Sequence, residues 1–127
     1  MIRVATPCLG ASLEAGACFV GPDLWVFVAG GDAPHIGSVS VGIPRESLTG
    51  DGSPGATVST FNVTGHKDDI VGNLFAQRLT TAFSCKTSIT CGIHFDNAAS
   101  SDLTLILAAA DELLEKLTEA VRRLPTA

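Results

Sequence analysis

Each of the three histidines in the sequence lies in a short glycine-containing segment at the expected end of a strand or helix. The segments are residues 30–37, 64–69 and 92–97, and each also contains aspartate. Histidine titrates near neutral pH, binds metals and transfers protons, and glycine lets backbone amides approach a ligand closely. The pattern therefore indicates a binding or catalytic site. Three unrelated structural histidines are the alternative.

The segment Thr-Gly-His-Lys-Asp-Asp at residues 64–69 favours an anion site. Gly65, His66 and Lys67 come at the start of a predicted helix, where free amides and the helix dipole attract negative charge. The ammonium group of Lys67 suits phosphate. Asp68 and Asp69 oppose a bare phosphate, and they favour a metal or a ligand with hydrogen-bond donors. Alternatively, the two carboxylates only stabilise the start of the helix.

The other two segments combine histidine with carboxylates in predicted turns. Asp32 and His35 flank Pro34, and the run Gly-Gly-Asp before it could form a nest of backbone amides. His94 lies near the end of a predicted strand, and Asp96 and Asn97 follow it. Asn97 is equally well explained as a turn residue.

We expect the histidines to converge on one site, either at one end of a sheet or across a dimer interface. Such a site could bind a divalent metal, which requires neutral imidazoles. The sequence contains no dinucleotide fingerprint, P-loop, nucleophile elbow or His-Glu-x-x-His motif. The candidate metal ligands are His35, His66 and His94.

The elements that must position these segments follow the order strands, helix, strand, helix. Residues 1–15 are ambiguous and could begin with a short strand. The predicted strands are 17–20, 24–29, 35–43 (ended by Pro44), 56–63 and 86–95, with a flexible loop at 50–55. The predicted helices are 67–83, with Ile70, Leu74, Leu79 and Phe83 near one face, and 103–124, with Ser101 as N-cap. This order predicts an α+β fold, with a mostly antiparallel sheet and two helices on one face.

The strand at residues 24–29, Leu-Trp-Val-Phe-Val-Ala, is apolar on both faces. Two helices can cover only one face of the sheet. We therefore expect a homodimer joined through the face that the helices leave bare. Trp25 or Phe27 could stack on a ligand ring, although core packing is the simpler role for both.

Length and composition predict one domain, residues 1–127, in the cytoplasm. The net charge is −5 and no basic stripe is present, which argues against a nucleic-acid partner. Pro7, Gly10 and Glu14 interrupt the apolar start, and five charged residues interrupt the last helix, so neither a signal peptide nor a membrane span is expected. Four cysteines without zinc or redox spacing indicate reduced thiols: Cys8, Cys18, Cys85 and Cys91.

An ordered set of motifs resembles the prenylated-flavin chaperone-like, or LpdD-like, family. The motifs are Pro-His-Ile-Gly at 34–37, Pro-Arg at 44–45, Gly-His-Lys-Asp-Asp at 65–69 and Gly-Ile-His-Phe-Asp-Asn at 92–97. Proteins of this family accompany non-oxidative aromatic acid decarboxylases. The resemblance, from about residue 20 to 117, implies a carrier that binds prenylated FMN or FMN. Its expected partners are a flavin prenyltransferase and a decarboxylase apoenzyme, to which it would deliver the flavin. The implied fold is similar to proteasome assembly chaperones, which are α+β dimers.

The main hypothesis is therefore a flavin-binding chaperone, and no residue is assigned a catalytic role. Gly65 and Lys67 would hold the phosphate. A small metal-dependent enzyme, either a hydrolase or a cofactor-maturing activity, is the alternative, and an assembly scaffold without a ligand is a third hypothesis. The candidate flavin-binding residues are Asp32, His35, Arg45, Gly65, His66, Lys67, Asp69, His94, Asp96 and Asn97.

Overall fold

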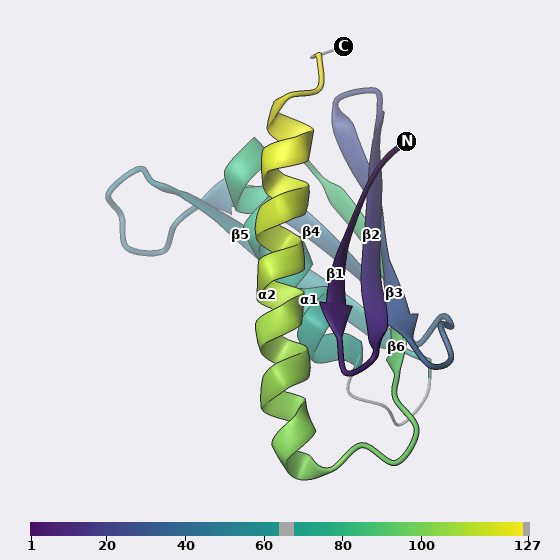
Figure 1. Cartoon of the computed structure of the whole chain (residues 1–127). Helices are drawn as coiled ribbons and strands as arrows, with labels where there is room; N and C mark the ends of the chain where they lie inside the picture. The colour runs from purple at the N-terminus through teal and green to yellow at the C-terminus, as the bar shows by residue number, and fades with distance from the viewer. Residues whose placement is uncertain (64–67, 126–127) are drawn as a thin grey trace.

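Six strands form one sheet in the order β1-β2-β3-β6-β4-β5, and two helices pack on it (Figure 1). The computed structural model describes residues 1–63 and 68–125. The bounds of the elements are β1 Ile2–Cys8, β2 Ala11–Val20, β3 Asp23–Gly31, β4 Ser38–Glu46, β5 Pro54–Asn62, α1 Asp68–Phe83, β6 Thr87–His94 and α2 Ser100–Arg122.

The last strand, β6, enters the middle of the sheet between β3 and β4. It runs parallel to β3, whereas the other neighbouring pairs of the described sheet are antiparallel. Consequently, the ends of β3 and β6 and the beginning of β4 lie at one end of the sheet. The prediction of a mostly antiparallel sheet in an α+β fold is confirmed.

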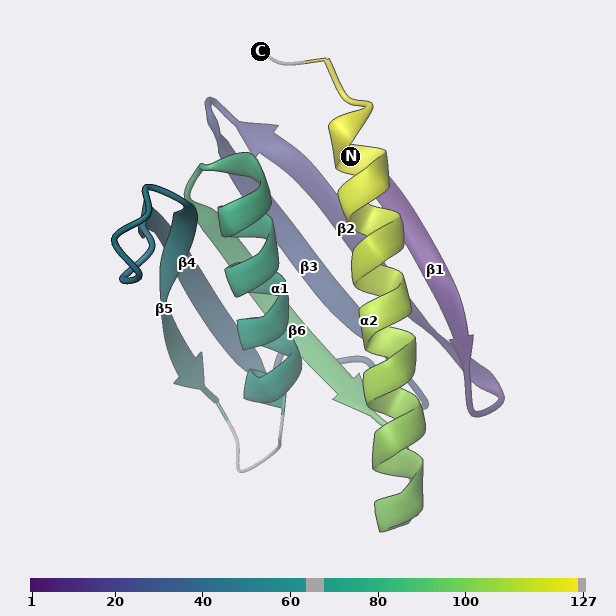
Figure 2. The same ribbon diagram turned by 90° about the vertical axis from the view of Figure 1, so that its left-hand side faces the viewer.

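Both helices lie on the same face of the sheet (Figure 2). α1 covers β4, β5 and β6, and α2 covers β1 and β2. Lys116 of α2 donates a 2.9 Å hydrogen bond to the carbonyl of Ala5 in β1. Burial of each large apolar side chain contributes about 1.5–3 kcal/mol. The largest side chains in this core include Leu13, Leu24, Phe75, Leu79, Ile89, Leu113 and Leu117.

The buried face of α1 is made largely of small side chains. Gly72 lies against the hydroxyls of Ser38 and Ser40, and a Cβ on it would come 3.0 Å from the Ser40 hydroxyl. Residues 68, 71, 72, 75, 76, 79 and 80 are buried. The predicted face is confirmed for Leu79, and Leu74 and Phe83 pack half-buried against the core, whereas Ile70 is 45% exposed. The centre of the buried face contains glycine, alanine and threonine, which the apolar periodicity did not include.

Two boundaries predicted around the first half of the sheet are also wrong. Residues 1–15 begin with the expected short strand, β1, but they also form the first half of β2, so the strand predicted at 17–20 begins at Ala11, after a turn at Leu9 and Gly10. The strand predicted at 35–43 begins at Ser38 and continues through Pro44 to Glu46. Pro44 is tolerated because β4 pairs with β6 only over Ser38–Gly42, so the strand has a single neighbour beyond that point.

The start of α2 also differs from the prediction. Its N-cap is Ala99, whose side chain makes no capping hydrogen bond, and Ser101 lies inside the helix. The Asp102 carboxylate instead accepts a 2.9 Å hydrogen bond from the Ala99 amide. The described part of the chain contains no helix with the length and apolarity needed to cross a bilayer.

The sheet face opposite the helices carries exposed apolar side chains, here called the bare-face patch. Trp25 is 39% exposed, so core packing was the wrong role for it. Phe27 is half-buried, because its ring lies over Gly16, where a Cβ would come 2.2 Å from ring atom Cε2. The patch is made of Trp25, Phe27, Val39, Val41, Ile43 and Phe61, with Ser88 and Thr90 among them.

Candidate functional site

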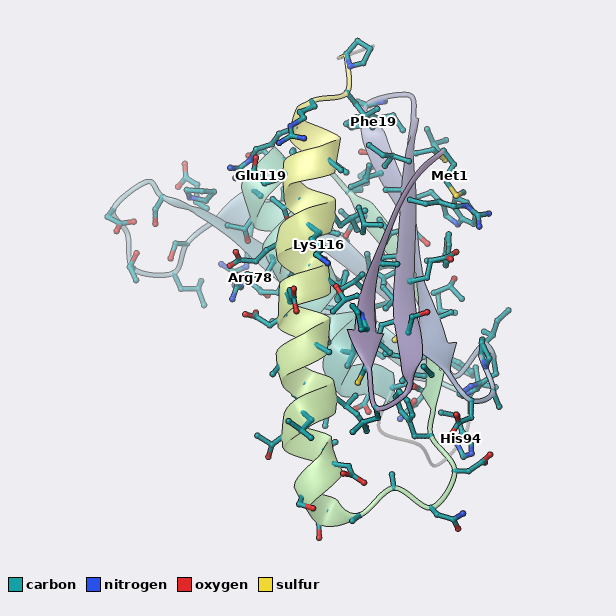
Figure 3. The ribbon with its side chains drawn as sticks, in the orientation of Figure 1. Met1, Phe19, Arg78, His94, Lys116 and Glu119 are labelled. Atoms are coloured by element: carbon teal, nitrogen blue, oxygen red, sulfur yellow. The ribbon has the colours of Figure 1, made fainter. Side chains whose placement is uncertain are left out.

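Two of the three histidine segments meet at one end of the sheet. Gly31 and His94 are paired residues at the ends of β3 and β6. The Asp32 amide donates a 2.7 Å hydrogen bond to the His94 carbonyl, and the Gly37 amide donates a 2.9 Å bond to the Cys91 carbonyl. Residues 32–37 are thereby attached along the end of β6. Figure 3 shows His94 at this end, where β6 leads into the connection to α2.

A buried carboxylate, Asp68, connects three parts of this site. Its Oδ2 accepts a 3.0 Å hydrogen bond from Nε2 of His35, and its Oδ1 accepts a 2.9 Å bond from the Ile93 amide. The Asp68 residue is only 4% exposed. Asp68 therefore joins the start of α1 to β6 and to the segment before β4.

The ring of His35 is held at both nitrogens. Nδ1 lies 3.1 Å from the Ala33 carbonyl oxygen, and Nε2 contacts Asp68. Both partners can only accept when the Asp68 carboxylate is ionised. The two hydrogen bonds then form together only on a doubly protonated imidazole. A metal ion would have to displace one of these partners, because it binds a neutral, unprotonated ring nitrogen.

A second histidine–carboxylate pair lies beside the first. His94 Nε2 donates to Asp96 Oδ1 at 3.0 Å, and the Asp96 amide donates to Asp32 Oδ2 at 2.9 Å. The rings of His35 and His94 are 6.4 Å apart between centroids and nearly perpendicular, at 80°. Their side chains are 29% and 38% exposed, so a ligand can reach both. His35, His94, Asp32, Asp68 and Asp96 are called the histidine cluster below.

Glycines make this close assembly possible. A Cβ on Gly92 would lie 1.6 Å from the His35 carbonyl oxygen, and one on Gly37 would lie 2.0 Å from Asp68 Oδ2. Gly31 has φ of +83°, and a Cβ there would lie 2.1 Å from the His94 carbonyl oxygen. These glycines therefore allow the segments to approach one another, whereas the sequence suggested that they would admit a ligand.

Two hollows adjoin the histidine cluster. An open groove of about 580 Å³ is lined by Gly30, Gly31 and Pro34, together with Ser12 and Glu14 of β2. A smaller cavity of about 160 Å³ lies between α1, the end of β6 and α2, with both Asp68 and His94 in its wall. The cluster therefore has an open groove of mixed polarity on one side and a mostly apolar cavity on the other.

Cys91, the cysteine close to the histidine cluster, is not suited to act as a nucleophile. Cys91 is buried in β6. Burial, and secondarily the Asp68 carboxylate, raise the pKa of the Cys91 thiol far above its usual value. The thiol therefore stays protonated and packs as a small apolar group.

Of the candidate residues, the structure brings together Asp32, His35, His94 and Asp96. Asn97 is exposed with φ of +55°, which fits the turn interpretation. Arg45 lies at the far end of β4, where it donates to the Thr57 hydroxyl and the Glu46 carbonyl. The hairpin that follows it points away from the rest of the sheet (Figure 1).

Four other predicted positions have different outcomes. Asp69 is half-buried beside Asp68, and it is Asp68 that contacts His35. Gly65, His66 and Lys67 lie outside the described residues, so the phosphate site remains a prediction. Among the residues that are described, no three His, Cys, Asp or Glu side chains are grouped as a metal site requires. Convergence is seen for His35 and His94.

Asp68 was missing from the candidate residues. It lies one helical turn before Val71 and Gly72, in phase with Phe75, Ala76 and Leu79 on the buried face. An acidic residue in phase with a buried helix face is the signal that could have identified it.

Comparisons with known proteins agree on one family and one fold. A family model for the prenylated flavin chaperone LpdD-like domain matches residues 8–122. Protein LpdD of Lactiplantibacillus plantarum is 28% identical over 119 residues, which cover 92% of this chain and 82% of the relative. A chain in the crystal structure of a novel chaperone complex for yeast 20S proteasome assembly matches with a TM-score of 0.56. That match has 14% identity and covers 96% of this chain and 97% of the other, so it shows the fold alone.

Proposed function

The chain belongs to the family of prenylated flavin chaperone LpdD-like domains, and from this premise we propose that it carries prenylated FMN, or FMN, and delivers it to a decarboxylase apoenzyme. The family resemblance inferred from the four motifs is confirmed. In this proposal the flavin comes from a flavin prenyltransferase and is bound at the histidine cluster. The bound flavin supplies the chemistry of the decarboxylase, and this chain binds, orients and releases it.

The observation that carries the proposal is the pair of half-exposed histidines beside the open groove. The bonds to Ala33 and Asp68 fix the ring of His35, whose exposed face can stack against a flavin ring, and His94 beside it can exchange a hydrogen bond with the polar edge of the flavin. The groove volume of about 580 Å³ falls within the usual range of roughly 300–1,000 Å³ for ligand pockets. The residues present therefore fit a flavin ring in size and in hydrogen-bonding character.

A metal-dependent enzyme has less support from the described residues. Both nitrogens of His35 face oxygen acceptors, and no three-ligand group is found in the described part of the chain. The carrier is therefore the function that we test first.

The decisive experiment titrates the purified chain with FMN and with prenylated FMN, and follows the flavin absorbance and fluorescence. We expect saturable binding of one or both. The double variant His35→Ala with His94→Ala removes the stacking surface of one ring and the hydrogen-bonding group of the other, and should weaken binding about tenfold or more. Circular dichroism checks that the variant is folded.

Arg45→Ala is the matched control for this experiment. Arg45 belongs to the family motifs, but it lies at the far end of β4. We expect its affinity to equal that of the wild type. The proposed site is wrong if Arg45→Ala loses the flavin while the double histidine variant keeps it. The carrier function is wrong if the wild type binds neither flavin.

Delivery is tested separately by mixing the flavin-loaded chain with an apo decarboxylase that requires prenylated FMN. We expect the flavin to move to the decarboxylase and activity to appear faster than with free flavin at the same concentration. Equal rates with and without the chain would contradict a delivery role, even if the chain binds flavin.

A further inference from the structure

An apolar cavity of about 160 Å³ lies behind the histidine cluster, on the helix side of the sheet. Val71 of α1, Ile93 of β6, and Leu103 and Ile106 of α2 are among the apolar residues of its wall. Leu103 and Ile106 are only half-buried, although they face this interior space. When a hydrocarbon group fills such a cavity, the burial of the apolar side chains around it lowers the free energy of the complex.

The size of the cavity limits what it can hold. A cavity of about 150 Å³ lined by aliphatic and aromatic side chains accepts benzene or xenon. The cavity here has a similar volume and a mostly apolar lining, with Asp68 and His94 in its wall, and it is open to solvent on one side. It therefore suits a compact hydrocarbon group of about five or six carbons, and it is too small for a flavin ring system.

The Asp68 carboxylate links the cavity to the polar site. Asp68 forms part of the cavity wall, and its Oδ2 accepts the hydrogen bond from His35. His94 also belongs both to the cavity wall and to the histidine cluster. A ligand whose polar ring lies at the mouth of the cavity, against His94, would place an adjoining apolar part inside the cavity.

We propose that this cavity is a subsite for a small branched hydrocarbon group attached to a polar ligand. The identity of that ligand rests on the proposed function, in which the ligand is prenylated FMN and the hydrocarbon group is its isoprenoid-derived ring, fused to the flavin. The subsite then distinguishes the prenylated cofactor from plain FMN, because only the prenylated form has a group that fills the cavity.

Ala98 provides a direct way to fill the cavity by mutation. It lines the cavity from the exposed connection between β6 and α2, so a larger side chain can enter without displacing the core. Ala98→Leu is the test variant and Ala99→Leu is its control. Ala99 is the neighbouring exposed residue, it does not line the cavity, and leucine is as poor an N-cap as alanine.

The first measurement uses a probe without flavin. 3-Methylbut-2-en-1-ol, a five-carbon isoprenoid alcohol, is titrated into the chain while methyl NMR signals are followed. We expect saturable shifts at Val71, Leu103 and Ile106 in the wild type and in Ala99→Leu, and none in Ala98→Leu. If saturating alcohol moves none of these methyls, or moves them equally in Ala98→Leu, the subsite is wrong.

The second measurement compares the two flavins. We expect the wild type to bind prenylated FMN at least tenfold more tightly than FMN. In Ala98→Leu this preference should disappear, while the affinity for FMN stays within twofold. Equal affinities for the two flavins in the wild type would overturn the subsite and leave the carrier function standing. If the alcohol binds in the cavity and neither flavin binds, the carrier function fails and the hydrocarbon subsite stands.

Discussion

Asp68 uses both of its carboxylate oxygens inside the protein. One oxygen accepts from the Ile93 amide and the other accepts from His35. A buried donor that loses its acceptor costs more than an exposed one, because water cannot replace the partner. At the scale of single residues, Asp68 therefore determines the positions of both the β6 backbone and the His35 ring.

Asp68→Ala should lower the free energy of unfolding by about 1–3 kcal/mol, since it leaves the Ile93 amide without its acceptor. Asp69→Ala is the matched control. Asp69 lies in the same first turn but is half-buried, so only its interaction with the helix dipole is lost, about 0.3–1 kcal/mol. Urea denaturation measures both values. Equal losses in the two variants would show that Asp68 acts only as a helix-capping charge.

Gly92→Ala should distort the site, because its Cβ would lie 1.6 Å from the His35 carbonyl oxygen. That oxygen belongs to the backbone, so the segment of residues 32–37 must move. We expect a loss of about 1–3 kcal/mol in the free energy of unfolding, together with weaker flavin binding.

Gly55→Ala is the control for Gly92→Ala. Its Cβ would lie 3.1 Å from Nη1 of Arg45, the movable end of a long side chain, and 3.3 Å from the Cα of Ser47, where a shift of a few tenths of an ångström is enough. The change should therefore stay within about 0.5 kcal/mol. A Gly92→Ala variant as stable as Gly55→Ala would mean that His35 does not pack against Gly92.

The sequence predicted four residues of the histidine cluster, because histidine, glycine and aspartate are adjacent in each segment. Asp68 was not among them, for a physical reason. The buried face of α1 packs small side chains such as Gly72 and Ala76 against Ser38 and Ser40. Apolar periodicity does not detect such a face, so Asp68 at its start was not recognised as a buried residue.

At the scale of elements, the position of β6 assembles the site. Because β6 enters between β3 and β4, it brings the end of β3, the start of β4 and the start of α1 to one place. The sequence predicted the element types in this half of the chain, but strand order depends on long-range pairing. The hairpin of β1 and β2 was missed since Ala15, Gly16 and Ala17 give little apolar alternation.

Ala99→Ser should stabilise α2 by about 0.5–1 kcal/mol. Ala99 is the N-cap with extended backbone, φ −81° and ψ 162°, and its side chain makes no capping hydrogen bond. A serine hydroxyl there can accept from a free amide of the first turn. Ala108→Ser, in the exposed interior of the helix, makes the same chemical change and should lower stability by up to about 0.7 kcal/mol. Thermal unfolding distinguishes the two, and the same sign in both would contradict the assigned N-cap.

At the scale of the whole molecule, the members of the bare-face patch are apolar or hydroxyl side chains, and the nearby charges at its Phe27 edge are Arg3, over the Phe27 ring, and its ion-pair partner Glu14. Ser88 and Thr90 of β6 alternate along it with apolar groups from β3 and β4. A two-fold interface places a surface against a copy of itself, so an uncharged apolar surface is self-complementary, whereas a charged one repels itself. We therefore propose a homodimer joined through this patch.

Val41→Glu should dissociate this dimer, because Val41 is exposed near the middle of the patch. The variant places two carboxylates in one interface, and like charges there cost several kcal/mol. Sedimentation should show a dimer for the wild type at micromolar concentration and a monomer for Val41→Glu. Leu105→Glu is the control. Leu105 is exposed on α2, in the helix layer, and its replacement should leave the dimer intact.

Alkylation of Cys18 tests which surface is buried. Cys18 of β2 lies opposite Trp25 of β3 on the bare face and is half-buried. Burial raises the pKa of the other three thiols, Cys8, Cys85 and Cys91, and therefore slows their alkylation. Dimerisation through the patch should protect Cys18 from alkylation in the wild type and in Leu105→Glu, but not in Val41→Glu.

A wild type that sediments as a monomer contradicts the homodimer. If Val41→Glu then also fails to load an apo decarboxylase while Leu105→Glu succeeds, the patch binds the decarboxylase instead of a second copy.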